Sequence, residues 1–185
     1  MTKLLGVTLD CKLSWSKHID AVVAKMGRSL FIIKRFSAFL TTLSTRQVLQ
    51  ALVLSYLDYC SIPWSGATKK KDLGKCQLVQ NRAARLVHGC TQRSNINNMH
   101  VILSWLKVEE RLTSSLLLFM RGINILNAPS CLSKLLAHSS DTHAYPTRHA
   151  ARGLFTVPKS RTDYGRHTVL HRSLDYMELY STSSN

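Results

Sequence analysis

The chain is strongly basic: its 185 residues contain 25 lysine and arginine residues against 10 aspartate and glutamate residues, a formal net charge of +15. Hydrophobic residues make up 45% of the sequence, which is enough to build a packed core and excludes wholesale disorder. An excess of one charge costs self-repulsion in a compact state, so it favours an anionic partner such as nucleic acid or an acidic membrane surface.

Hydrophobic and cysteine patterns indicate an intracellular protein. The longest apolar stretches, residues 51–54 and 116–120, are far shorter than the roughly 20 residues that a bilayer requires, so we expect no membrane span. The N-terminus reaches a second lysine before any long apolar run, unlike a secretory signal. The five cysteines are odd in number and scattered, which suits reduced thiols in the nucleus or the cytoplasm.

The N-terminal half is predicted to form a small β-hairpin followed by three helices. Residues 4–10 and 12–15 are short apolar segments at hairpin distance. Apolar residues then recur at helical spacing in three stretches, which span residues 16–39, 44–63 and 71–88.

Local signals set the limits of these helices. Ser44, followed three residues later by Gln47, matches a capping box at a helix start. Pro63 is expected to stop the second helix, and Gly89 supplies a C-terminal stop for the third.

The C-terminal half is predicted to contain further helices and then an irregular basic tail. Helical patterns cover about residues 97–106, 108–126 and 130–137, whereas prolines and glycines interrupt the chain after Ser139 and no amphipathic period survives. The expected fold class is mainly α. Its expected regions are a hairpin (1–15), a helical bundle (16–89), an additional helical region (90–137) and a basic, partly disordered tail (138–185).

The third predicted helix carries the clearest functional signal, because Lys71, Lys75, Arg82 and Arg85 fall within a sector of roughly 80°. Such a row can neutralise phosphates, although a solvated helix face is the plain alternative. Arginine pairs with phosphate through two hydrogen bonds, which favours Arg82 and Arg85. The other candidate contacts are basic residues off the apolar stripe of the first helix and in the tail: Lys25, Arg28, Arg35, Arg148, Arg152, Lys159, Arg161 and Arg166.

Tail residues suit either an RNA-contacting arm that orders on binding or a merely solvated remnant. Trp15, Trp64 and Trp105 could stack on bases, but their apolar neighbours favour packing in the core. His167 and His171 have a spacing found in zinc sites, yet no third ligand lies nearby. We therefore predict no metal, no cofactor, no catalytic residue and no small-molecule substrate.

Five blocks of residues occur in a distinctive order along almost the whole chain. They are KLLGVTLD with KLSW (3–15), YLDYC with PWS (56–65), LVQNRAARLV (78–87), LSWL with a following ER (103–111), and YPTR, VPKSRT and YGR (145–166). In this order they resemble the part of a non-LTR (LINE-type) retrotransposon reverse transcriptase that follows the catalytic palm.

The resemblance implies a fold and a role for each region. The hairpin would be the primer grip, with Leu5, Gly6 and Val7 at its turn, and residues 16–89 would form a thumb-like three-helix bundle. In an intact RNA-directed DNA polymerase this region clamps the template–primer duplex. A glycine at the turn lets the backbone approach nucleic acid closely, and an ordinary hairpin glycine is the alternative.

Departures from the family pattern bear on activity. The Tyr-x-Asp-Asp box that holds the catalytic metals is absent, because no two aspartates are adjacent. Neither an endonuclease domain nor a zinc knuckle is present, YMELY at 176–180 replaces the usual Trp-Asn-x-Leu-Pro ending, and Leu4 stands where an aromatic residue is commoner.

We accordingly expect a truncated protein without polymerase activity that binds RNA or an RNA–DNA hybrid without reading its sequence. Two alternatives remain open. One is a helical module that docks onto a separate palm polypeptide or onto a second copy of itself, and the other is a non-functional remnant of a transposable element.

Overall fold

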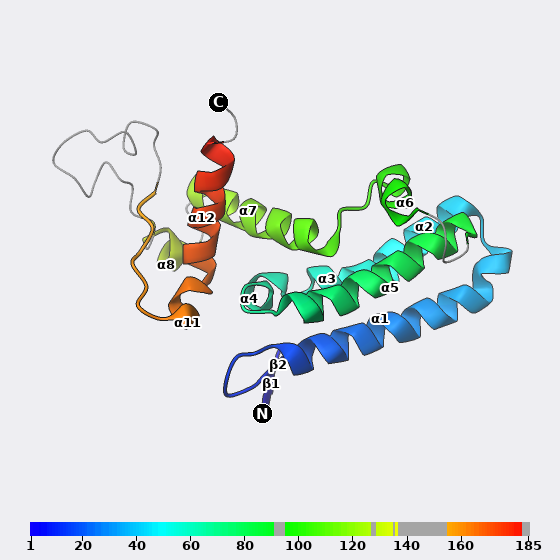
Figure 1. Cartoon of the computed structure of the whole chain (residues 1–185), viewed down its shortest axis with the longest axis horizontal. Coiled ribbons are helices and arrows are strands. Elements are labelled where there is room, and N and C mark those ends of the chain that lie inside the picture. Colours follow the sequence, from blue (N-terminus) through cyan, green and yellow to red (C-terminus); the bar gives the residue numbers. More distant parts are fainter. Residues whose placement is uncertain (91–94, 127–128, 135, 137–154, 183–185) are drawn as a thin grey trace. The chain divides into compact units, whose positions relative to one another are not determined.

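The protein is mainly helical, as predicted, and begins with a two-stranded antiparallel hairpin (Figure 1). The chain divides into two compact units, Met1–Thr113 and Ser114–Asn185, which are described one at a time. The structure is a computed structural model that describes residues 1–90, 95–126, 129–134, 136 and 155–182.

The hairpin pairs strand β1 (Thr2–Leu4) with strand β2 (Val7–Leu9). Leu5 and Gly6 form the two-residue turn, and both have positive φ, at 46° and 82°. Two-residue turns of this kind match the right-handed twist of the flanking strands. Glycine tolerates this conformation, whereas leucine adopts it at a cost.

The prediction of a second strand at residues 12–15 was wrong. Since the turn at Leu5 closes the hairpin early, the partner of β2 is the segment that precedes the turn. Residues 12–15 instead lie in a turn held by Asp10, whose carboxylate accepts a hydrogen bond from the Ser14 amide at 2.8 Å. The Asp10 carbonyl also accepts from the Leu13 amide at 3.1 Å.

The predicted first helix is present as α1 (Ser16–Phe36), with a short 3₁₀ turn, η1 (Ser37–Phe39), completing it. The predicted second helix is divided into consecutive segments. They are α2 (Thr42–Leu49), a π-helical stretch η2 (Gln50–Leu54), α3 (Ser55–Asp58) and α4 (Ser61–Ser65).

Two predicted signals in this second helix were misassigned. Thr41, not Ser44, caps α2, and its hydroxyl accepts a hydrogen bond from the Ser44 amide at 3.1 Å. Pro63 lies within the first turn of α4, where a missing N–H is tolerated. The break before α4 falls instead at Cys60, whose φ of 47° is left-handed.

The third helix agrees closely with prediction. Helix α5 spans Lys70–His88, and Gly89 ends it with a left-handed φ of 60°. Helix α6 (Ile96–Leu103) is shorter than expected because Ser104, at φ 53°, ends it. Helix α7 spans Val108–Leu126, the predicted bounds.

The core of the first unit lies where α1 packs along α5, two helices that run side by side in Figure 1. Ile19 and Met26 of α1 are fully buried there, as are Trp64 of α4 and Ala83 and Ala84 of α5. The alanines leave room for α5 to approach its neighbours closely.

The second unit contains α7 from Ser114 onward, α8 (Ser130–Ser133), α11 (Asp163–Arg166) and α12 (Val169–Thr182). Its core contains Met120, Ile123, Phe155 and Leu174. The tail was expected to be irregular, but two helices form within it. The apolar stripe of α12 contains Leu170, Leu174 and Met177. Such a narrow stripe did not reveal the helix in the sequence, because prolines and glycines interrupt the segment before it.

Candidate nucleic-acid interface

The four basic residues predicted to share one face of α5 divide into two pairs. Lys71 and Arg82 are separated by about 16 Å along the helix axis, at about 1.5 Å per residue. Lys71 is exposed near the start of α5, whereas Arg82 and Arg85 lie near its end. These two arginines, together with residues of α1, line a groove.

Lys75 forms ion pairs within the protein. Its amino group lies 2.6 Å from Asp20 of α1 and 2.8 Å from Asp72. The hydrogen bonds to Asp20 and Asp72 raise the pKa of Lys75 above its ordinary value. Asp72 is buried, and hydrogen bonds from Lys75 and from the Ser16 hydroxyl lower its pKa. Lys75 therefore fastens α5 to α1 and is not free to bind a phosphate.

The groove lies between the C-terminal halves of α1 and α5 and has a volume of about 660 Å³. This lies within the range of about 300–1,000 Å³ typical of ligand sites. Its walls combine apolar side chains with three cations. The lining residues are Gly27, Leu30, Phe31 and Lys34 of α1, Val79, Arg82, Arg85 and Leu86 of α5, and Gly89 and Cys90 beyond it.

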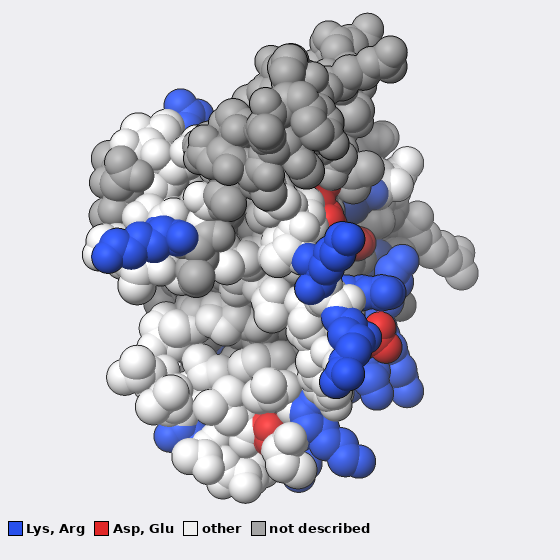
Figure 2. Space-filling model, turned by 90° about the vertical axis from the view of Figure 1, so that its left-hand side faces the viewer, with Lys and Arg blue, Asp and Glu red and all other residues white. Residues whose placement is uncertain are grey.

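Among the residues that the structure describes, the cations of this groove, Lys34, Arg82 and Arg85, have no acidic partner. No aspartate or glutamate lines the groove, and no ion pair joins any of the three to a described residue. The Nε atom of Arg85 is buried and has no hydrogen-bond partner among the described residues. Figure 2 views the chain from the left-hand side of Figure 1, away from the groove, and on that face too the lysine and arginine side chains are more prominent than the acidic ones. The groove thus offers unneutralised positive charge to an anion.

Some residues of the block QNRAARLV (80–87) pack α5 against its neighbours, and others carry the positive charge of the groove. The amide nitrogen of Gln80 donates to the Leu106 carbonyl at 2.7 Å. Asn81 Oδ1 lies 2.9 Å from His100 Nε2, so both polar side chains hold α5 to the α6 region. Arg82 and Arg85 are left to line the groove. The spacing of this block therefore presents the arginines on one side while the others pack.

Basic residues of α1 lie beside aromatic rings. The guanidinium of Arg35 lies 5.7 Å from the centre of the Phe31 ring, and the Lys25 amino group lies 6.0 Å from that of Tyr56. Both are cation–π distances. Arg28 is exposed and does not line the groove. Of the three predicted contacts on α1, Arg35 therefore lies beside the ring of a groove residue, Phe31.

Two groove residues, Phe31 and Lys34, were missed by sequence reasoning. Phe31 is 62% exposed although it is a large aromatic residue. An aromatic side chain off the apolar stripe of an amphipathic helix was the available signal. By contrast, Trp15, Trp64 and Trp105 are at most 8% exposed, which confirms the prediction that they pack in the core.

At the hairpin, the Tyr59 hydroxyl donates a hydrogen bond to the Leu5 carbonyl at 2.8 Å, and its ring lies close to Gly6. Leu5 is exposed, whereas Val7 is buried against the core. The predicted primer-grip segment therefore contains both an exposed turn residue, Leu5, and a residue of the core, Val7.

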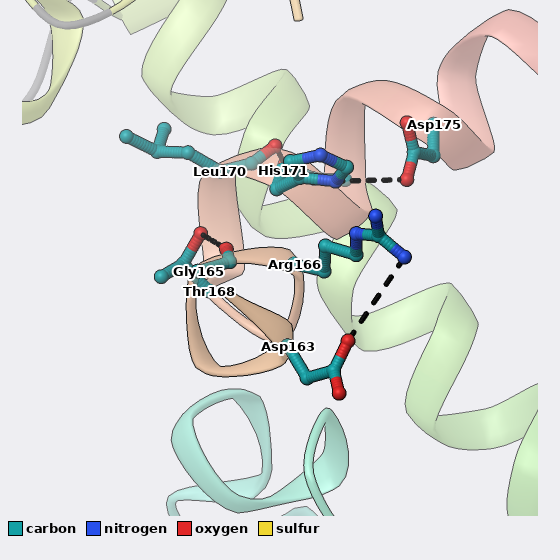
Figure 3. A network of polar contacts seen from close by, with 8 residues as sticks. Asp163, Gly165, Arg166, Thr168, Leu170, His171 and Asp175 are labelled. Atoms are coloured by element: carbon teal, nitrogen blue, oxygen red, sulfur yellow. Dashed lines mark hydrogen bonds and ion pairs between the residues drawn. The ribbon is translucent and has the colours of Figure 1, made fainter. Parts of the chain in front are cut away.

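The tail residues within the described part are exposed to solvent. Lys159 and Arg161 are exposed, and Arg166 lies 3.9 Å from Asp163 in the loose pair drawn in Figure 3. Arg148 and Arg152 lie outside the described residues.

Figure 3 also shows His171 pointing toward Asp175 one helical turn away, at 3.0 Å. This contact occupies one nitrogen of a histidine whose spacing from His167 is that of a zinc pair. In the described part of the chain, no group of three or more histidine, cysteine, aspartate or glutamate residues is placed to hold a metal ion.

Comparisons of the chain with family models, curated proteins and solved structures find no match. Within the described residues, no helix combines the length and apolar character needed to span a bilayer.

Proposed function

We propose that the chain binds nucleic acid through the phosphate backbone, without reading base sequence, and that the groove between α1 and α5 is the main contact. The observation that carries this proposal is the convergence of Lys34, Arg82 and Arg85 in a groove without an acidic residue. Binding to phosphates releases counterions, which favours association with a chain of net charge +15.

The same proposal derives the chain from the part of a non-LTR reverse transcriptase that follows the catalytic palm. The block at residues 80–87 supports this ancestry, because it resembles a thumb signature and contributes two arginines to the groove. The thumb clamps template and primer in the family. With no two adjacent aspartates in the sequence, we assign the chain binding and no polymerase chemistry. The five free thiols suit a reducing, intracellular compartment.

The test is binding of the purified chain to a fluorescent RNA–DNA hybrid across a salt series, with circular dichroism on the same sample. We expect tight binding that weakens steeply with salt. Replacing Lys34, Arg82 and Arg85 together with glutamine should reduce the salt slope by about 0.9 for each phosphate that the variant no longer neutralises. The helical signal should stay unchanged.

A matched control neutralises three exposed lysines outside the groove, Lys3, Lys12 and Lys71. Both triple variants remove the same charge, so only a localised site distinguishes them. Equal losses of affinity in the two variants would place binding on diffuse charge and refute the groove. An absence of binding by the folded chain would refute the proposed function itself.

A second candidate function rests on exposed apolar side chains. Leu4 and Leu5 of the hairpin are 59% and 78% exposed, and Phe39 after α1 is 85% exposed. Exposed apolar patches often mark protein interfaces, so the hairpin would dock onto a separate palm polypeptide or a second copy. Concentration-dependent mass by light scattering, abolished in a variant with Leu4 and Leu5 changed to serine, would favour self-association.

A further inference from the structure

We infer that the groove between α1 and α5 takes an unpaired nucleotide, whose base stacks on Phe31 while Lys34 and Arg82 hold its phosphates. Single-stranded nucleic acid would then be preferred over a duplex or hybrid. This inference rests on the proposed function and narrows its partner to one form of nucleic acid.

The walls of the groove indicate a ligand that is partly anionic and partly flat and apolar. Gly27, Leu30, Phe31 and Lys34 recur at helical spacing and form one face of α1. A duplex presents phosphates and sugars at its surface and keeps its base faces stacked inside. An unpaired strand presents both phosphates and base faces, so it matches both components of this groove.

Phe31 is the element that phosphate binding alone leaves unexplained. Its ring lines the groove with 62% of the residue exposed, and Arg35 covers it at a distance of 5.7 Å. Proteins that hold single strands without sequence preference combine such exposed rings with a positively charged groove. A base that covers Phe31 would remove apolar surface from water.

The charges of the groove are not equivalent. Arg85 lies in the last turn of α5, where a cation complements the negative end of the helix dipole. Lys34 also lies in the last turn of its helix, α1, whereas Arg82 lies one turn before Arg85. Lys34 and Arg82 are exposed and Arg85 is half-buried, so more of the charge of Lys34 and Arg82 is available to a ligand. Lys34 follows Phe31 by one helical turn, which places a cation beside the ring on the same face.

The experiment compares probes for the full chain at one salt concentration: single-stranded oligo-U and oligo-dT, the hybrid made from complementary strands, and an oligonucleotide of abasic sites. We expect the two single strands to bind alike and more tightly than the hybrid or the abasic strand. Phe31→Leu should weaken single-strand binding on the order of tenfold and change hybrid binding by less than about twofold.

Two variants control for the role of the ring. Phe31→Tyr keeps a flat face and should retain the affinity for oligo-dT. Phe36→Leu changes an aromatic residue of the same helix that is 58% exposed but does not line the groove, and it should leave every probe unaffected. Because both positions are exposed, neither change removes a core side chain.

Cys90 provides an independent measure of occupancy, because it is exposed and lines the groove. Bound oligo-dT should slow alkylation of Cys90. The rates at the other exposed thiols, Cys11, Cys60 and Cys131, should stay the same. Protection of all four thiols or of none would overturn the assignment of the strand to this groove.

The remaining outcomes distinguish failure of the inference from failure of the proposed function. Equal binding of hybrid and single strand, unaffected by Phe31→Leu, would overturn the inference and leave the proposed function standing. An absence of binding to every probe would overturn both. If polyglutamate displaced a labelled strand from the chain as effectively as oligo-dT does, the groove would be a general anion site. Binding of only RNA or only DNA would contradict recognition through the base and phosphate chemistry that both share.

Discussion

The amino group of Lys75 lies 2.6 Å from a carboxylate oxygen of Asp20, and this contact joins α5 to α1 across 55 residues of sequence. The same amino group contacts the buried Asp72 at 2.8 Å. Lys75, which the sequence places among candidate phosphate contacts, therefore forms an ion pair that holds two helices together. Substitution of Lys75 tests whether α5 contributes to stability separately from its contribution to binding.

We expect Lys75→Gln to lower the melting temperature by a few degrees and to leave the salt slope of binding unchanged. Removing Lys75 leaves the buried Asp72 with a hydrogen bond from the Ser16 hydroxyl but no paired cation, and a buried carboxylate without its cation is unfavourable. Thermal denaturation followed by circular dichroism measures the effect. Lys71→Gln is the control, because Lys71 is exposed on the same helix; equal melting temperatures in the two variants would contradict the structural role.

Stability should fall as the solution is acidified, through two buried histidines. Burial, together with nearby Lys25, lowers the pKa of His18 below its ordinary value of 6.5. Burial also lowers the pKa of His100, where nearby Lys107 lowers it further and Glu110 opposes the shift. The unfolded chain takes up protons near pH 6.5 while the folded chain resists them. The free energy of unfolding is thus fully present above that pH and is lost as pH falls toward the folded pKa values.

The matched variants keep the hydrogen bonds and remove the titration. His18 Nδ1 accepts from the Thr8 amide at 3.3 Å, so asparagine can supply an acceptor in its place. His100 Nε2 lies 2.9 Å from Asn81 Oδ1, a position that a glutamine amide can occupy. Urea denaturation between about pH 7.5 and pH 5 should show a weaker pH dependence in His18→Asn, and weaker still in the double variant. An unaltered dependence would locate the titration at other groups.

Leu5→Asn should stabilise the hairpin. Leu5 has a left-handed φ of 46° beside Gly6 at 82°, and turns with positive φ at both central residues favour Asn-Gly. Relief of this strain should raise the free energy of unfolding by about 1 kcal/mol, measured by urea denaturation. Leu4→Asn is the control: Leu4 is similarly exposed but lies in β1, where asparagine is disfavoured, so a gain in that variant would refute the role of the turn.

Periodicity and end signals predicted the long helices because both are local. The α5 pattern and its stop at Gly89 depend on neighbouring residues alone. Local signals failed where several alternatives stood close together. Thr41 and Ser44 are both capable caps, and only the fold decides that Thr41 begins α2. Pro63 is equally compatible with the end of one helix and with the first turn of another.

The candidate site was predictable in part for the same reason. The spacing of Arg82 and Arg85 places them together on α5, and the structure places both in the groove. Whether Lys34 and Phe31 line the groove depends on which side of α1 packs against the end of α5. This packing is a tertiary contact that local sequence patterns do not predict. Lys75 was assigned to binding although Asp72, three residues before it, could be recognised as a partner from helical spacing. Its second partner, Asp20, is remote in sequence, and no helical period relates the two residues.

Cys76 should stay unmodified while the other four thiols react. It is fully buried in α5, and burial raises the pKa of its thiol to about 12, so little thiolate forms at neutral pH. We expect mass spectrometry after mild alkylation to show modification at Cys11, Cys60, Cys90 and Cys131, which are all exposed. A fifth adduct should appear only as denaturant unfolds the chain, at the midpoint seen by circular dichroism. Rapid modification of Cys76 in the folded chain would mean that α5 does not pack as described, and both the groove and its ion pairs would then lose their basis.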